Sequence, residues 1–131
     1  MYQFVDHPTN RLSRGSQLVL WAMRSWTCQL NNGRCPPAAL APGFHRFGII
    51  DALPPFHKMM VLLNHHAAGN FVFRCLAAPV IGDDEAVLLG VWQDIAAGQV
   101  VNAEATLAMI ADADAAKVIT KTMLAAQTFA R

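Results

Sequence analysis

The stretch Asp83–Gln99, DDEAVLLGVWQDIAAGQ, predicts a helix that decides the fold. Its apolar residues recur at helical spacing and form one wide stripe: Val87, Leu88, Val91, Trp92 and Ile95. Asp83, Asp84 and Glu85 suit the first turn, because a carboxylate can cap orphan N–H groups and is favoured by the helix dipole. Gly98 is placed to end the helix in a left-handed conformation. We expect the rest of the chain to pack around this helix.

The composition is that of one globular domain. The chain has 131 residues, of which 54% are hydrophobic and 15% charged. It can therefore bury a substantial core without disulfides, and it differs clearly from disordered compositions. The low charged fraction leaves little polar surface, which favours a partner that covers apolar side chains, most simply a second copy of the chain. The alternative is a monomer that exposes a few apolar side chains.

Signals for export and for membrane insertion are missing. The longest apolar runs, such as 86–92, span about seven residues, against roughly twenty in a membrane-spanning helix. Residues 1–15 show neither the apolar core nor the cleavage site of a secretion signal. Three cysteines at unrelated spacings do not make a disulfide framework. These features predict a cytoplasmic protein with reduced thiols and no contact with a membrane.

Charge is divided unevenly along the chain. Residues 1–80 carry seven Arg and Lys against two Asp, a net charge of +5, whereas residues 81–131 carry three against seven acidic residues, a net charge of −4. All five histidines lie in the first part. This division suits head-to-tail self-association, contact between the two parts of one fold, or an acidic partner for the basic part. The alternative is that both charged faces are simply solvated.

The first thirty residues predict an extended arm followed by a helix. Residues 1–9 carry no periodic pattern, and we expect them to be extended. A helix is expected over about 10–30, where apolar residues recur at helical spacing with Arg14 and Arg24 on the other side. Gly33 is suited to end it, because glycine accepts a positive φ.

Prolines divide the next part into short helices. Residues 37–41 predict a short helix before a turn at Pro42-Gly43, and 44–53 predict another turn or two. Three residues of the latter are expected to point inward: Phe44, Phe47 and Ile50. Residues 54–66 then predict a helix that is too apolar to face water on many sides, so it should be buried or lie in an interface.

The rest of the chain predicts further helices joined by short links. Residues 71–76 are rich in strand-forming residues but have no partner strand, so we expect a helix or an extended segment. Asn102 is suited to cap a helix ending near 110, and Asp112 to cap a last helix over about 113–129. Alanines, and Gly90 in the central helix, are expected to let helix axes approach closely.

Together these elements predict an all-α protein in a single domain, 1–131. Short links between helices favour antiparallel neighbours. We expect an irregular orthogonal or bundle-like pack of about five to seven helices.

No complete catalytic set is written in the sequence. Cys28, Cys35 and Cys75 are of the type that binds zinc or acts as a nucleophile, but the seven-residue step between the first two differs from zinc-finger spacing. His65-His66 are adjacent and would diverge on a helix. Neither a GxSxG nucleophile motif nor a phosphate-binding glycine loop is present. We expect no cofactor and no metal, and a small metal-binding or thiol enzyme using the cysteines stays as an alternative.

The basic first part offers a candidate interaction site. The stretch 33–60, GRCPPAALAPGFHRFGIIDALPPFHKMM, resembles a helix–turn–helix with its turn at Pro42-Gly43. Its candidate interaction residues are Arg34, His45, Arg46, His57 and Lys58. The expected second helix is mostly apolar and the basic excess is modest for a DNA-binding protein, so two proline-bounded core helices are favoured.

Three segments carry a resemblance to known sequences: Trp26 to Cys28, GRCPPAAL at 33–40 and DDEAVLLGVW at 83–92. In this order, before an alanine-rich end, they resemble small uncharacterised all-helical proteins of alphaproteobacteria. The resemblance implies an all-α single domain of bacterial origin and brings no activity or functional residue.

The sequence thus leads to a non-enzymatic, cytoplasmic interaction or regulatory protein that acts as a homodimer. The first alternative is a nucleic-acid-binding regulator that uses the basic residues of 1–80. The second is the metal-binding or thiol enzyme.

Overall fold

The protein is an all-α single domain, as its sequence predicts. The computed structural model describes residues 8–9, 12–66 and 72–127. These residues form no strand, and their helices are α1 (Arg14–Asn31), α2 (Pro36–Arg46), the 3₁₀ helix η2 (Ile50–Ala52), α3 (Leu53–His66), α4 (Asp83–Ala96), α5 (Val100–Ala108) and α6 (Ala113–Ala125). An isolated antiparallel bridge joins Pro8 to Val80. The rest of the expected N-terminal arm lies outside the described residues.

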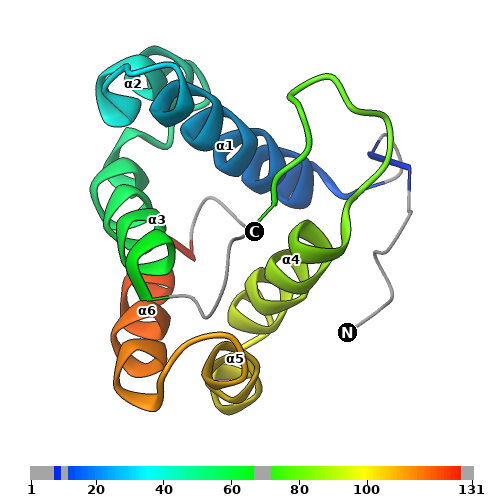
Figure 1. Cartoon of the computed structure of the whole chain (residues 1–131), viewed down its shortest axis with the longest axis vertical. Helices are drawn as coiled ribbons and strands as arrows, with labels where there is room; N and C mark the ends of the chain where they lie inside the picture. The colour runs from blue at the N-terminus through cyan, green and yellow to red at the C-terminus, as the bar shows by residue number, and fades with distance from the viewer. Residues whose placement is uncertain (1–7, 10–11, 67–71, 128–131) are drawn as a thin grey trace.

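The six α-helices close into an irregular ring around one core (Figure 1). α1 packs against α2 and α4, α3 packs against α2 and α6, and α5 packs against α4 and α6. The short links on either side of α5 therefore make successive helices neighbours, as predicted. α1 and α2 lie at one end of the long axis of the molecule and α5 at the other.

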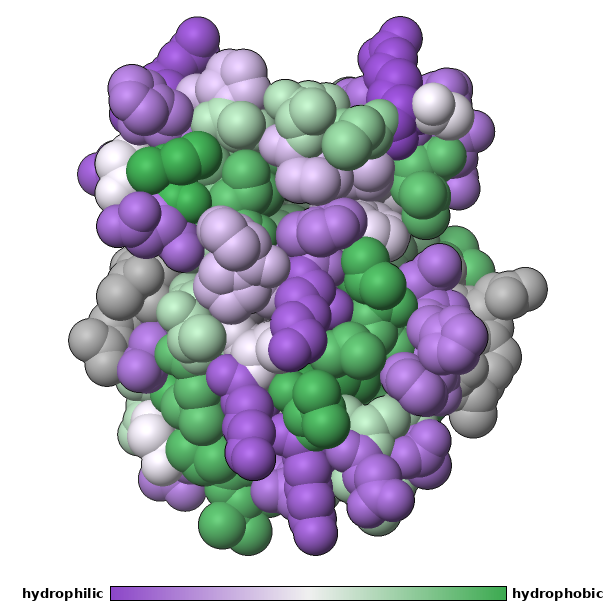
Figure 2. Space-filling model, turned by 90° about the vertical axis from the view of Figure 1, so that its left-hand side faces the viewer, coloured by the Kyte–Doolittle hydropathy of each residue, from purple (hydrophilic) through white to green (hydrophobic). Residues whose placement is uncertain are grey.

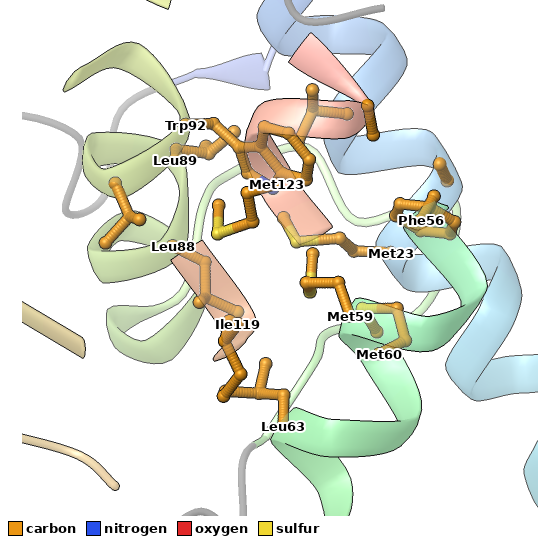
Figure 3. Packing of buried hydrophobic residues seen from close by; sticks show 14 of the residues in the cluster. Met23, Phe56, Met59, Met60, Leu63, Leu88, Leu89, Trp92, Ile119 and Met123 are labelled. Atoms are coloured by element: carbon orange, nitrogen blue, oxygen red, sulfur yellow. The ribbon is translucent and has the colours of Figure 1, made fainter. Parts of the chain in front are cut away.

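The core inside this ring is formed mainly by α1, α3, α4 and α6 (Figure 3). Among its buried side chains are Met23, Phe56, Met59, Met60, Leu63, Leu88, Leu89, Trp92, Ile119 and Met123. Each contributes roughly 1.5–3 kcal/mol by leaving water. The predicted apolar stripe of the central helix is confirmed, because most of it faces this core. The apolar 54–66 segment is also buried on one side, whereas Val61 points to solvent.

Three predicted helix ends are confirmed. Gly33 and Gly98 adopt φ values of +71° and +78° just after α1 and α4. Asp112 caps α6, since its Oδ1 accepts a hydrogen bond from the N–H of Ala115 at 2.8 Å. At the start of α4 the N-cap is Gly82 rather than an aspartate, and Glu85 Oε1 accepts the Gly82 N–H at 2.9 Å.

The predicted turn at Pro42-Gly43 is wrong, because α2 runs straight through it. A proline inside a helix costs about 3 kcal/mol, since it removes the hydrogen bond to the carbonyl four residues earlier. Here that residue is Ala38, which is exposed, so water can bind its carbonyl. The burial of Leu40 and Phe44 on the inner side of α2 offsets the remaining cost. The stretch 33–60 therefore has no turn at Pro42-Gly43, the position at which the helix–turn–helix resemblance requires one.

Several smaller expectations also need correction. Phe47 and Ile50 are exposed rather than inward, because η2 interrupts the helical register after α2. Asn102 lies inside α5 and does not cap it, because the chain re-enters a helix at Val100 directly after the left-handed Gly98. α6 ends at Ala125, and the expected continuation to 129 reaches beyond the described residues. Residues 72–75 form neither helix nor strand, which is compatible with the extended alternative expected for 71–76.

Gly90 does not bring two helices close together, contrary to expectation. A Cβ built on it meets no atom within 4 Å. Because glycine in a helix interior is less favourable than alanine, Gly90→Ala is expected to raise the free energy of unfolding by about 0.5–1 kcal/mol. Urea denaturation measures this. Gly98→Ala is the matched control and should be destabilising, because a positive φ strains any side chain. A destabilised Gly90→Ala protein would contradict the open space around Gly90.

The outer side of α2, α3 and α6 carries apolar and polar side chains side by side (Figure 2). Among the exposed apolar residues are Val61 of α3 and Val118 of α6. Single apolar side chains among polar ones are ordinary for a protein surface. In the part of the chain that is described, no helix has the length and hydropathy needed to cross a membrane.

Candidate functional site

The five basic residues singled out from the sequence do not form one cluster. Arg34 lies in the turn before α2, whereas His45 and Arg46 lie at its far end. An eleven-residue helix is about 16 Å long at 1.5 Å per residue, so α2 separates these positions. Lys58 is exposed on α3, and Arg34 donates a long hydrogen bond of 3.4 Å to Gln29.

His57, the fifth of these residues, has a structural role in the packing of α1 on α3. Its Nδ1 accepts a hydrogen bond from Trp26 Nε1 at 3.0 Å, and the two rings lie 6.0 Å apart. Burial lowers the pKa of His57. The histidine is therefore held neutral as an acceptor for a buried indole, which leaves it little freedom to bind a partner.

The three cysteines have free, exposed thiols. Cys28 and Cys75 line the same pocket from α1 and from the 72–82 segment, whereas Cys35 precedes α2. Within the described ranges, no three His, Cys, Asp or Glu side chains are placed to hold one metal ion. His66 lies 3.9 Å from Asp112, and its ring meets that of His65 edge-on.

A buried ion pair between α1 and α4 is the feature that sequence reasoning missed. Arg24 and Glu85 are 3% and 0% exposed, and they meet through two hydrogen bonds of 2.7 and 2.8 Å. Arg24 also donates to the carbonyls of Ala78 and Val80, each at 3.0 Å. The prediction that Arg24 lies on the polar side of its helix is thus wrong. The charge is buried because Glu85 neutralises it and four hydrogen bonds inside the protein replace those to water.

Glu85 holds the 72–82 segment from the other side. Its carboxylate accepts the backbone N–H of Gly82 at 2.9 Å and of Arg74 at 3.0 Å. Burial acts to raise the pKa of Glu85, but these hydrogen bonds and the Arg24 charge outweigh burial and lower the pKa below its usual value. The pair therefore stays ionised and fixes an irregular segment against two helices.

The fixed segment forms one wall of a long furrow on α1. A pocket of about 330 Å³ is lined by Arg14, Gln17, Leu18, Trp21 and Phe47. The next, of about 350 Å³, shares Gln17 and Trp21 and reaches Leu76. A third, of about 280 Å³, shares Leu76 and Arg24 with the second and contains Cys28 and Cys75. We call these three neighbouring pockets together the α1 furrow.

The middle of the α1 furrow is aromatic. The ring of Trp21 lies 5.9 Å from that of Phe44 and 6.1 Å from that of Phe47, which it meets edge-on. Gly43 makes room for this ring, because a Cβ there would approach Trp21 Cη2 to 2.5 Å. Aromatic rings that are partly open to solvent are typical anchors of protein interfaces.

The charges along the α1 furrow are positive. Arg14 and Arg74 line it in addition to the paired Arg24, and its described lining includes no carboxylate. The sequence from 8 to 50, which holds α1 and α2, contains no Asp or Glu at all. This surface is therefore suited to an apolar ligand or segment with a negative charge.

The opposite end of the molecule carries the complementary surface. On α5, Val101 and Met109 are 82% and 72% exposed, and with the exposed Ala105 they follow one another at four-residue steps on a single side of the helix. We call these three residues the α5 ridge. Glu104 lies beside them, and Asp94 of α4 and Asp112 and Asp114 at the start of α6 lie in the segments that lead into and out of α5.

Comparisons with known proteins do not assign this surface to a family. No protein-family model matches the chain, and no similar curated protein or solved structure was found.

Proposed function

We propose that the chain is a non-enzymatic interaction protein that acts as a homodimer in the cytoplasm. The observation that carries the proposal is the α5 ridge, where the mostly exposed apolar side chains of Val101 and Met109 lie on one side of the helix, two turns apart. A soluble monomer rarely presents its largest apolar side chains in this way, and such a patch is typical of an interface. The free, exposed thiols suit a reducing compartment.

The low charge of the chain supports the same proposal. With 15% charged residues, the protein has few polar groups to surround additional apolar patches. Apolar side chains are also exposed along the 72–82 segment, where Val72 and Leu76 point to solvent. A second copy is the partner always available to cover these patches, and homo-oligomers are the commonest assemblies of soluble proteins.

The experiment is sedimentation velocity from micromolar to near-millimolar protein. We expect twice the chain mass of 14.3 kDa, with a dissociation constant in the micromolar range or below. A duplex DNA added over the same salt series tests the alternative regulator, whose binding would weaken steeply with salt. A protein that stays monomeric throughout would refute the homodimer, and DNA binding by that monomer would favour the nucleic-acid alternative.

A further inference from the structure

We infer that the α5 ridge of one copy docks in the α1 furrow of the other, and this inference rests on the homodimer proposed above. The ridge is a convex apolar side of a helix, and the furrow is a concave surface centred on Trp21. A helix laid into an apolar groove is a recurrent mode of protein recognition, in which residues one turn apart anchor the helix. Val101, Ala105 and Met109 follow one another at such one-turn steps, with the two larger side chains two turns apart.

Charge favours this pairing over contact between two identical surfaces. Ridge against ridge would bring two acidic α5 regions together, and furrow against furrow would bring together the guanidiniums of Arg14. Ridge in furrow places Glu104 near Arg14, so unlike charges meet at the edge of an apolar contact. The charged residues of the helices differ in the same sense, since α1 and α2 at one end of the long axis hold no acidic residue and α5 at the other holds Glu104 and no basic one (Figure 1).

Interface size favours two such contacts in each pair. A stable interface buries about 800 Å² of each partner, and the whole described surface measures 7043 Å². α5 has only nine residues, so a single ridge in a single furrow falls short of that area. When each copy places its ridge in the furrow of the other, the buried area doubles and the assembly closes as a dimer.

The test uses one variant for each surface of the full chain. The ridge variant, Val101→Lys with Met109→Lys, removes the apolar anchors and adds positive charge that the furrow repels. The furrow variant, Arg14→Glu with Phe47→Glu, reverses the charge of the furrow and removes one of its aromatic rings. Each is expected to weaken dimerisation at least tenfold in sedimentation velocity, which corresponds to about 1.4 kcal/mol. Val61→Lys, at a half-exposed apolar site on α3, is the control and should leave dimerisation unchanged.

An equimolar mixture of the two variants decides the mode of pairing. In a mixed pair the intact ridge of one copy meets the intact furrow of the other, and the lysines of the altered ridge meet the glutamates of the altered furrow. We therefore expect the mixture to form a heterodimer although each variant alone is monomeric. A mixture that stays monomeric would overturn the inference, and a furrow variant that still dimerises on its own would overturn it in favour of ridge-to-ridge contact.

Failure of the inference differs from failure of the homodimer itself. If both variants remain dimeric, with circular dichroism showing native helix content, the homodimer stands and its docking surfaces lie elsewhere. If the unaltered protein is monomeric, the homodimer and the inference fall together.

Discussion

Glu85→Ala is expected to lower the free energy of unfolding by about 3–5 kcal/mol, because it leaves the buried Arg24 guanidinium without its counter-charge. The loss reaches beyond one ion pair. The same carboxylate accepts the backbone N–H groups of Gly82 and Arg74, and these would also lose their bonds. Urea denaturation followed by circular dichroism measures the change. Asp83→Ala, in the same helical turn but exposed, is the control and should cost less than about 1 kcal/mol.

Replacing both partners separates the ion pair from the rest of the network. An apolar replacement of a buried pair is often neutral, so a variant with Arg24→Met and Glu85→Leu would recover most of the stability if charge pairing were the whole effect. We expect it to stay destabilised, because Arg24 also satisfies the carbonyls of Ala78 and Val80. Full recovery in the double variant would show that these backbone bonds contribute little.

The same pair makes stability depend on acid. Because the pKa of Glu85 is lower in the folded protein than its usual value of 4.5, ionised Glu85 stabilises the fold above that value. This contribution is lost as pH falls further, through the folded-state pKa. Glu85→Gln should remove this part of the acid dependence. Protonation of His57 also destabilises the fold, but it does so at higher pH and equally in the unaltered protein and in Glu85→Gln. The free energy of unfolding is therefore measured against pH for both proteins, and the difference between the two curves is due to Glu85.

Local sequence signals were sufficient for most of the helices. The apolar stripe of α4, the left-handed Gly98 and the capping Asp112 depend on neighbouring residues, and each is where the sequence predicts it. The errors fall where tertiary contacts override local preference. Pro42 should break a helix, yet the burial of Phe44 keeps α2 continuous.

The candidate site was harder to predict, because its parts come from distant segments. Arg24 looks like a surface residue until Glu85, sixty-one residues away, is placed beside it. The α1 furrow likewise needs the 72–82 segment as its wall. What the sequence did contain was the charge division. The structure keeps part of it, with Arg14 in the furrow and Glu104 beside the apolar ridge, whereas Asp84 and Glu85 bind the backbone of the 72–82 segment. The five basic residues chosen from motif resemblance had no such spatial support.

In the core, a loss of side-chain volume should lower the free energy of unfolding far more than an apolar substitution that conserves volume. Phe56 is fully buried where α3 meets α2, and its ring lies 5.6 Å from that of Phe44. Phe56→Ala should therefore lower the free energy of unfolding by about 3–5 kcal/mol, since the surrounding helices cannot collapse into the space.

The surrounding methionines provide the contrast that tests this explanation. Met23, Met59, Met60 and Met123 fill the same core (Figure 3), and their unbranched side chains adapt to irregular spaces. Met59→Leu nearly conserves volume and should cost less than about 1.5 kcal/mol. Thermal and urea unfolding of both variants measure the two values. Equal losses would mean that this core is packed as tightly around its methionines as around Phe56, and that adaptability does not explain their number.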